Sequence, residues 1–142
     1  MKTARQLLAD KSEGVYSIAP DASVYDALQL MAEKDIGALV VLDGAKLVGI
    51  FTERDYARKV ILHGKSSKEI RVREIMTHRV LCVTPEQMTD ECMAVMTEKR
   101  CRHLPVVEEK RVVGVLSIGD LVKEVISEQR ETIIQLESYI MS

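Results

Sequence analysis

Aromatic side chains make up only 4% of this 142-residue sequence, which has no Trp, a single Phe and four Tyr. Positive charge is not in excess either, because 20 Lys and Arg stand against 22 Asp and Glu for a net charge of −2. Nucleic-acid binding needs a basic field for the phosphates, and single strands also need aromatic side chains for base stacking. The composition therefore argues against nucleic acid as a partner, while its 46% hydrophobic residues suit a globular domain.

Cysteine and metal-ligand patterns are also sparse. Cys82, Cys92 and Cys101 form no Cys-x-x-Cys pair, and the three histidines lie 15 and 25 residues apart. This excludes a disulfide scaffold and makes a zinc site improbable, so we predict no metal. The sequence starts with nothing that resembles a leader, and its longest apolar run, residues 38–42, is far shorter than the ~20 residues of a membrane span. We expect a reducing, cytoplasmic location and no membrane partner.

An internal repeat is the most informative feature that is present. A shift of 65 residues aligns residues 15–61 with 80–126 without a gap, and 12 of the 47 pairs are identical. Upstream, residues 3–8 resemble residues 71–76. Neither copy is long enough for a comfortable core of its own, so we expect two repeats, 1–70 and 71–142, in one module.

Both copies have the same predicted order of elements: a short strand that ends at a proline, a helix with one apolar face, a hairpin of two strands, and a second helix. The predicted ranges are 15–18, 23–34, 38–42, 46–52 and a helix from Glu53 in the first copy, and 80–83, 89–99, 104–107, 111–117 and a helix from Ile118 in the second. This β-α-β-β-α order, present twice, predicts an α/β fold in which helices cover small sheets.

The last helix is expected to run on from Ile118 towards Tyr139, beyond the point where its repeat ends. Its first turns have apolar residues for the core, but Ile133, Ile134, Leu136, Ile140 and Met141 are left over. Leftover apolar residues indicate either a frayed tail or, as we favour, contact with a second chain.

Each copy closes with the motif Gly-h-h-(Thr/Ser)-x-x-Asp, in which h is apolar, at Gly49–Asp55 and Gly114–Asp120. With residues 36–41 and 102–107 before the hairpins, and Arg73-Glu-Ile-Met-Thr77 before the second copy, the paired units resemble the cystathionine-β-synthase (CBS) domain. This resemblance covers nearly the whole chain. It implies a tandem pair with pseudo-twofold symmetry, clefts that take adenosine compounds, frequent dimerisation into a flat disc, and no chemistry of its own.

The two motifs also suit a nucleotide on physical grounds. Thr52 and Ser117 stand where a strand ends and a helix begins, so their hydroxyls and the free N–H groups of the first turn can bind a phosphate. Asp55 and Asp120, three residues later, can accept hydrogen bonds from both ribose hydroxyls. An alternative stays open, because Ser or Thr at an N-cap with an acid three residues on is also the capping box, which stabilises helices without any ligand.

Adenine would need an apolar slot with backbone partners, for which the candidates are Ile18, Val83, Ala38, Leu39, His103 and Leu104. Basic residues for phosphate differ between the copies, because Arg54 and Arg58 of the first stand opposite Gly119 and Lys123 of the second.

Arg102 and His103, which precede the second hairpin, have no basic counterpart in the first copy. We therefore expect two unequal clefts between the repeats, the stronger with Thr52, Arg54, Asp55 and Arg58, and with Arg102 or His103 reaching it or the second. A solvated helix face is the alternative for these basic residues.

The sequence thus predicts a non-catalytic regulatory module whose clefts bind AMP, ADP, ATP or NAD(H), with S-adenosylmethionine less expected. We expect a homodimer that signals to a regulated protein, which the sequence does not identify. The alternative is a dimerisation scaffold that has no physiological nucleotide.

Overall fold

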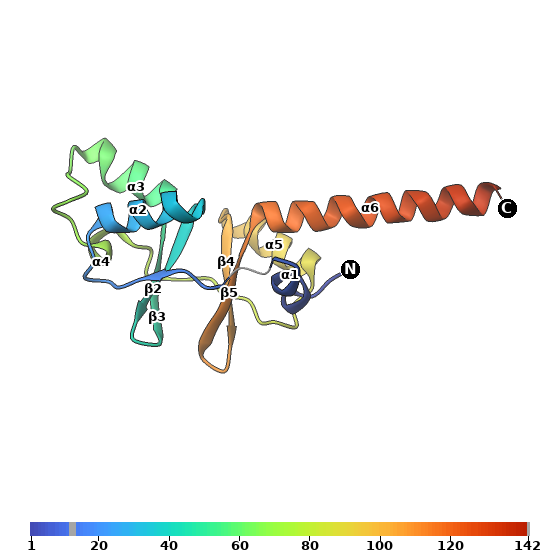
Figure 1. Cartoon of the computed structure of the whole chain (residues 1–142), viewed down its shortest axis with the longest axis horizontal. Coiled ribbons are helices and arrows are strands. Elements are labelled where there is room, and N and C mark those ends of the chain that lie inside the picture. The colour runs from blue at the N-terminus through green and yellow to red at the C-terminus, as the bar shows by residue number, and fades with distance from the viewer. Residues whose placement is uncertain (12–13, 142) are drawn as a thin grey trace. The chain divides into compact units, whose positions relative to one another are not determined.

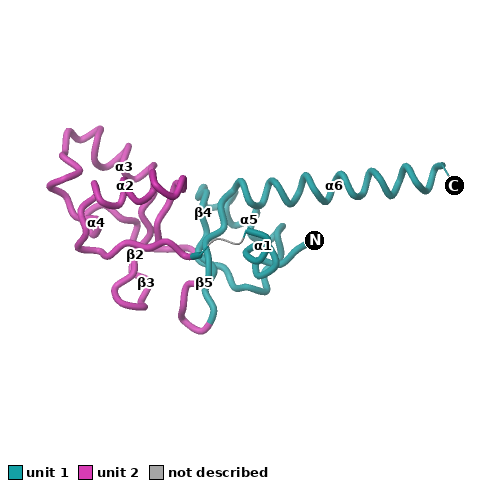
Figure 2. The backbone as a smooth tube through the Cα atoms, in the orientation of Figure 1, with its two compact units in different colours: residues 1–14, 82–108, 113–142 teal, residues 15–81, 109–112 magenta. Residues whose placement is uncertain are grey.

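The computed structural model describes residues 1–11 and 14–141 (Figure 1). The chain divides into two compact units (Figure 2): unit 1 contains residues 1–14, 82–108 and 113–142, and unit 2 contains residues 15–81 and 109–112. The two repeats therefore fall in different units, the first in unit 2 and the second in unit 1. The boundaries predicted from the sequence are 1–70 and 71–142. In the structure, residues 1–14 are grouped with the second repeat, and residues 71–81 and 109–112 with the first.

Unit 2 has a three-stranded sheet with helices. Its elements are β1 (Ser17–Ile18), α2 (Val24–Lys34), β2 (Ala38–Asp43), β3 (Lys46–Thr52), α3 (Glu53–Lys59), the short 3-10 helix η1 (Ile61–His63) and α4 (Val72–Ile75). The strand order is β1-β2-β3, with β1 parallel to β2 and β2 antiparallel to β3. The predicted order of elements is confirmed, although the strand expected over 15–18 is reduced to two residues.

Local sequence explains these elements. The Ser23 side chain accepts a hydrogen bond from the Asp26 backbone N–H and so caps α2, whose inner face buries Val24, Ala27 and Met31. The hairpin turns at Gly44, whose φ of 63° lies in the left-handed region that favours glycine. Phe51 is fully buried at the centre of the unit 2 core.

Unit 1 repeats this arrangement with less sheet. Its elements are α1 (Ala4–Lys11), α5 (Thr89–Lys99), β4 (His103–Glu108), β5 (Arg111–Ser117), whose first two residues are grouped with unit 2, and α6 (Ile118–Met141). The prediction of a strand over 80–83 is wrong, because in this segment only Val83 forms a bridge, parallel to Val106. Leu81 and Cys82 are exposed, so no packing supports a longer strand there.

A flanking helix packs over the motif glycine in each unit. A Cβ placed on Gly49 would lie 2.5 Å from the sulfur of Met76, which directly follows α4. A Cβ on Gly114 would lie within 3.0 Å of three side-chain carbons of Leu8, in α1. The glycine shared by both motifs therefore has a packing role, since any larger residue would collide with the flanking segment.

Helix α6 extends past the packed part of unit 1. Leu121 is fully buried, whereas every residue from 129 to 141 is exposed. The prediction of a long last helix with uncovered apolar residues is confirmed. Among the described residues, no helix combines the length and the hydropathy that crossing a membrane requires.

Candidate functional site

The first motif forms a tight corner between β3 and α3, which we call the Thr52 corner. Thr52 is the N-cap of α3, and its Oγ1 accepts a hydrogen bond from the Asp55 backbone N–H at 3.1 Å. In return, Asp55 Oδ2 accepts from the Thr52 backbone N–H at 3.0 Å and from its hydroxyl at 3.2 Å. The alternative weighed from sequence, a capping box, is therefore present here.

Asp55 is enclosed by its own unit. Its second oxygen, Oδ1, accepts from the Thr77 hydroxyl at 3.3 Å and forms an ion pair with Lys59 Nζ at 3.0 Å, and the residue is only 7% exposed. A carboxylate offers about four acceptor positions, and four contacts from the chain already use them. A ribose could bind Asp55 only by displacing Thr77 or Lys59.

The other residues predicted for the first cleft surround this corner unevenly. Arg54 and Arg58 both lie on α3 with exposed side chains, as either a phosphate site or a solvated helix face would require. Ile18 is half-buried against the core of unit 2, and Ala38 is buried at the start of β2.

The second motif forms the corner between β5 and α6, which we call the Ser117 corner. Asp120 Oδ2 accepts from the Ser117 backbone N–H at 2.8 Å, and Ser117 Oγ accepts from the Asp120 backbone N–H at 3.2 Å. The same cap is formed, but here the Asp120 side chain is 24% exposed. Within the residues that the structure describes, the partners of this carboxylate meet Oδ2, so Oδ1 is the oxygen that can accept from a ligand.

Lys11, the last residue of α1, adds a cation to the Ser117 corner. Its Nζ donates to Asp120 Oδ2 at 3.0 Å and to the Val115 carbonyl at 2.9 Å. Burial by itself would raise the pKa of Asp120, but the Ser117 backbone N–H and the Lys11 ammonium together bring that pKa below its usual value. Asp120 is therefore an anion at neutral pH, held beside a fixed positive charge.

His103 lies at the same corner, at the start of β4. Burial lowers the pKa of its imidazole, and the positive charges of Lys11 and Arg102 lower it further, while Asp120 opposes them. His103 is therefore neutral at pH 7 and can donate or accept a hydrogen bond. Arg102 and His103 were predicted to reach either the first or the second cleft. Both residues lie in the unit that contains the Ser117 corner.

Val83 and Leu104, predicted for the adenine slot, lie in the core of unit 1. Leu104 is fully buried and Val83 is 2% exposed. At these two positions only the backbone can meet a ligand.

Sequence reasoning missed Lys11, Lys59 and Thr77, which bind the motif carboxylates. None belongs to the motif, and all but Lys59 are more than 20 residues from the carboxylate they bind. The resemblance between residues 3–8 and 71–76 was the available signal, because these matching segments are the ones that pack on the motif glycines.

Comparisons with known proteins agree with this fold. The family profile of the CBS domain matches residues 8–62 and 72–127. A CBS-domain protein of known structure from Burkholderia ambifaria MC40-6 is 55% identical, with a TM-score of 0.86 over 90% of this chain and 96% of that one. The hexameric CBS-CP12 protein from bloom-forming cyanobacteria is 31% identical, with a TM-score of 0.76 over 84% of this chain and 70% of that one.

A curated relative from Arabidopsis thaliana, the mitochondrial CBS domain-containing protein CBSX3, is 45% identical over 84% of this chain. The alignment spans only 61% of that relative's own length. The two profile matches cover both repeats and include the Thr52 and Ser117 corners. This chain belongs to the CBS-domain family.

Proposed function

We propose that the chain is a regulatory module that binds an adenosine nucleotide at the Ser117 corner. Proteins with paired CBS domains are generally regulatory modules for adenosine ligands. The observation that carries the proposal for this chain is the Asp120 carboxylate, which is ionised, partly exposed, and has Oδ1 available beside Lys11 and His103.

Each group at this corner has a separate part in binding. Asp120 Oδ1 accepts hydrogen bonds from the ribose hydroxyls, as a carboxylate does for paired donors. The Ser117 hydroxyl, the dipole of α6 and the cations Lys11 and Arg102 favour the phosphates. The N–H groups expected to be free in the first turn contribute less, because those of Ile118 and Asp120 already donate to the Arg102 carbonyl and to Ser117 Oγ. AMP, ADP, ATP and NAD(H) share these groups, whereas S-adenosylmethionine has no phosphate and is the weaker candidate.

The Thr52 corner is the weaker candidate site in this proposal. We expected the stronger cleft there, but the Asp55 carboxylate is enclosed by Thr77 and Lys59. Its phosphate contacts would come from Thr52, Arg54 and Arg58, with little help from the acid.

Signalling completes the proposed function. A nucleotide regulates only if two states of the protein bind it with different affinity. We propose that the chain acts as a homodimer whose state another protein senses, without catalysis and in the cytoplasm. The self-association in this proposal is supported by one relative, the cyanobacterial CBS-CP12 protein, which is a hexamer.

A scaffold without a physiological nucleotide is the second candidate. It is favoured by the caps themselves, because both motif acids already stabilise a helix start. Under this alternative the function of the chain would be assembly alone.

Calorimetric titration of the full chain with AMP, ADP, ATP, NAD and S-adenosylmethionine tests the proposal. Asp120→Asn keeps the size of the side chain and removes its charge, so we expect the affinity for the best ligand to fall about tenfold or more. Asp55→Asn is the matched control and should change the affinity by less than about threefold. The melting temperature of each variant shows that it is folded.

If no ligand binds the parent chain, or if folded Asp120→Asn binds as tightly as the parent, the proposal is wrong. The first outcome would leave the scaffold as the better account. An effect of Asp55→Asn that is larger than that of Asp120→Asn would move the site to the Thr52 corner.

A further inference from the structure

Helix α6 carries apolar side chains that its own unit does not cover. Val122, Ile126, Ile133, Leu136 and Ile140 are 42%, 45%, 54%, 57% and 77% exposed. They recur along a 24-residue helix, in contrast to the scattered single residues that are normal on a protein surface.

These residues follow a heptad spacing. Ile126, Ile133 and Ile140 are seven residues apart, and so are Val122, Gln129 and Leu136, with alternating steps of four and three between the two series. This is the a/d pattern by which one helix packs against another. We call these six residues the α6 seam.

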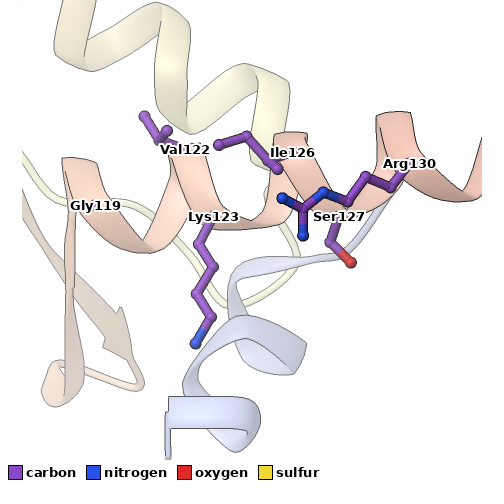
Figure 3. Close-up of a pocket in the computed structure, with 6 residues that line it drawn as sticks. All are labelled: Gly119, Val122, Lys123, Ile126, Ser127 and Arg130. Carbon is purple, nitrogen blue, oxygen red and sulfur yellow. The ribbon is translucent and has the colours of Figure 1, made fainter.

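The seam lies on a different face of α6 from the one that packs on unit 1. The packed face includes buried Leu121 and also Glu124 and Glu128, which pair with Lys2 and with the Met1 amino group. Figure 3 shows Val122 and Ile126 projecting to the same side of α6, away from Lys123 and Ser127. A shallow groove runs along this part of the helix, lined by residues between Gly119 and Arg130.

A second helix packed on the distal half of the seam would stabilise it. Residues 129–141 are exposed on every side, and an isolated helix of about this length is only marginally stable in water. An a/d seam of isoleucine and leucine fits a second a/d seam, and an identical copy supplies one.

The residues that flank the seam determine the orientation of that copy. One flank is charged throughout, with Lys123, Arg130 and Glu137, and the other is uncharged, with Val125, Thr132 and Tyr139. A parallel pair places the charged flank of each helix against the uncharged flank of the other. An antiparallel pair places charged against charged and uncharged against uncharged, so it satisfies both flanks.

We propose that two copies of this chain pair through antiparallel α6 seams. In the register that covers the whole seam, Ile126 packs on Leu136 of the second copy, Ile140 on Val122 of the second copy, and Ile133 on Gln129 of the second copy. Twofold symmetry makes each contact occur twice. Lys123 then faces Glu137 of the second copy, and the one unfavourable contact is Arg130 against its own symmetry mate.

This pairing rests on the homodimer of the proposed function, but it requires no nucleotide. Sedimentation equilibrium of the full chain over a range of concentrations measures it without ligand. Ile133→Asp places a carboxylate in the seam, and we expect the dimer dissociation constant to rise about 100-fold or more. Ile134→Asp is the matched control, because it makes the same change one residue outside the seam and should alter the constant by less than about threefold.

Charge reversal tests the orientation. Lys123→Glu should weaken the dimer about tenfold, and adding Glu137→Lys should restore it, because the reversed pair is again attractive. In a parallel pair the two positions lie about 21 Å apart along the helix, so the double variant would show no rescue.

A parent chain that stays monomeric, or equal effects of Ile133→Asp and Ile134→Asp, would overturn the proposal, and so would a Lys123→Glu effect that Glu137→Lys does not reverse. Calorimetry on monomeric Ile133→Asp separates this question from the ligand. Unchanged AMP binding there would leave the nucleotide proposal standing whatever the result for α6.

Discussion

The Thr52 corner and the Ser117 corner share a motif and a cap, yet they hold their acids in different surroundings. Asp55 is enclosed by Lys59 from its own helix and by Thr77, with 9% of the side chain exposed. Asp120 is held by Lys11 from the N-terminal helix, with 24% of the side chain exposed. The same four-residue pattern therefore gives one acid that is enclosed by its unit and one that stays partly exposed.

The difference comes from the segments packed beside each motif. Lys59, on the last turn of α3, is replaced by Glu124 at the matching position of α6, so the ion pair that Asp55 forms with the residue four positions later has no counterpart at Asp120. His103 takes the position of Ala38 at the start of the preceding strand. The duplicated motif fixes the corner, and its neighbours determine what the corner can bind.

The largest effects should come from what the two corners share, the motif glycines. Gly49→Ala and Gly114→Ala should each lower the free energy of unfolding by about 1–3 kcal/mol, because the added Cβ overlaps Met76 or Leu8. Thermal and urea unfolding would measure the loss.

Truncating the side chain that overlaps each added Cβ then distinguishes the two glycine positions. Leu8→Ala should relieve most of the strain at Gly114, where the three nearest atoms to the added Cβ all belong to the Leu8 side chain. Met76→Ala should relieve less at Gly49, because the Thr77 carbonyl also lies 3.0 Å from the added Cβ. Equal rescue in the two double-mutant cycles would contradict this difference.

A smaller contrast is expected from the acids themselves. Asp55→Ala should cost about 2 kcal/mol of folding free energy, because it removes the acceptor of the Thr52 backbone N–H in the capping box and leaves the Thr77 hydroxyl without its acceptor. Asp120→Ala should cost about 1 kcal/mol, since its surroundings are more exposed and water can replace its contacts. Chemical denaturation of both variants under the same conditions measures the difference, and equal losses would show that the two acids are not in different surroundings.

Much of this fold could be predicted because it depends on local patterns. The apolar face of α2, the Gly44 turn and the Thr52 cap each follow from residues within one or two turns, and the structure confirms them. The strand expected over 80–83 failed because its support depends on tertiary packing, which hydrophobic composition does not reveal.

The site could be predicted only in part, for the same reason. The motif identified Thr52, Asp55, Ser117 and Asp120, but the contacts that distinguish the two acids come from outside it. Lys11 reaches Asp120 across 109 residues of sequence, and Thr77 reaches Asp55 across 22. Such contacts depend on how the flanking helices pack, so spacing within the motif could not indicate which acid would be enclosed.

The smallest expected effect is a pH response that only the Ser117 corner has. The pKa of His103 lies below its usual 6.5 in the folded chain because of burial and the charges of Lys11 and Arg102. As the pH falls below 6.5, the unfolded chain takes up a proton on this imidazole before the folded chain does, so stability decreases until the folded pKa is passed. His103→Gln should flatten the stability profile in this window, measured by urea unfolding at a series of pH values.

The Asp120 carboxylate affects stability in a different pH range from His103. The pKa of Asp120 lies below 3.8 in the folded chain, so its contribution to stability is present above that pH and is lost only as the pH falls through the folded pKa. Asp120→Asn should therefore change the profile at strongly acidic pH. It should also widen the His103 window, because it removes the negative charge that opposes the lowering of the His103 pKa. The residue of the first repeat that matches His103 is Ala38, so Ala38→His is the reciprocal test. If this variant showed the same near-neutral pH response at the Thr52 corner, the response would come from the shared strand position. It would then not depend on the charges around the Ser117 corner.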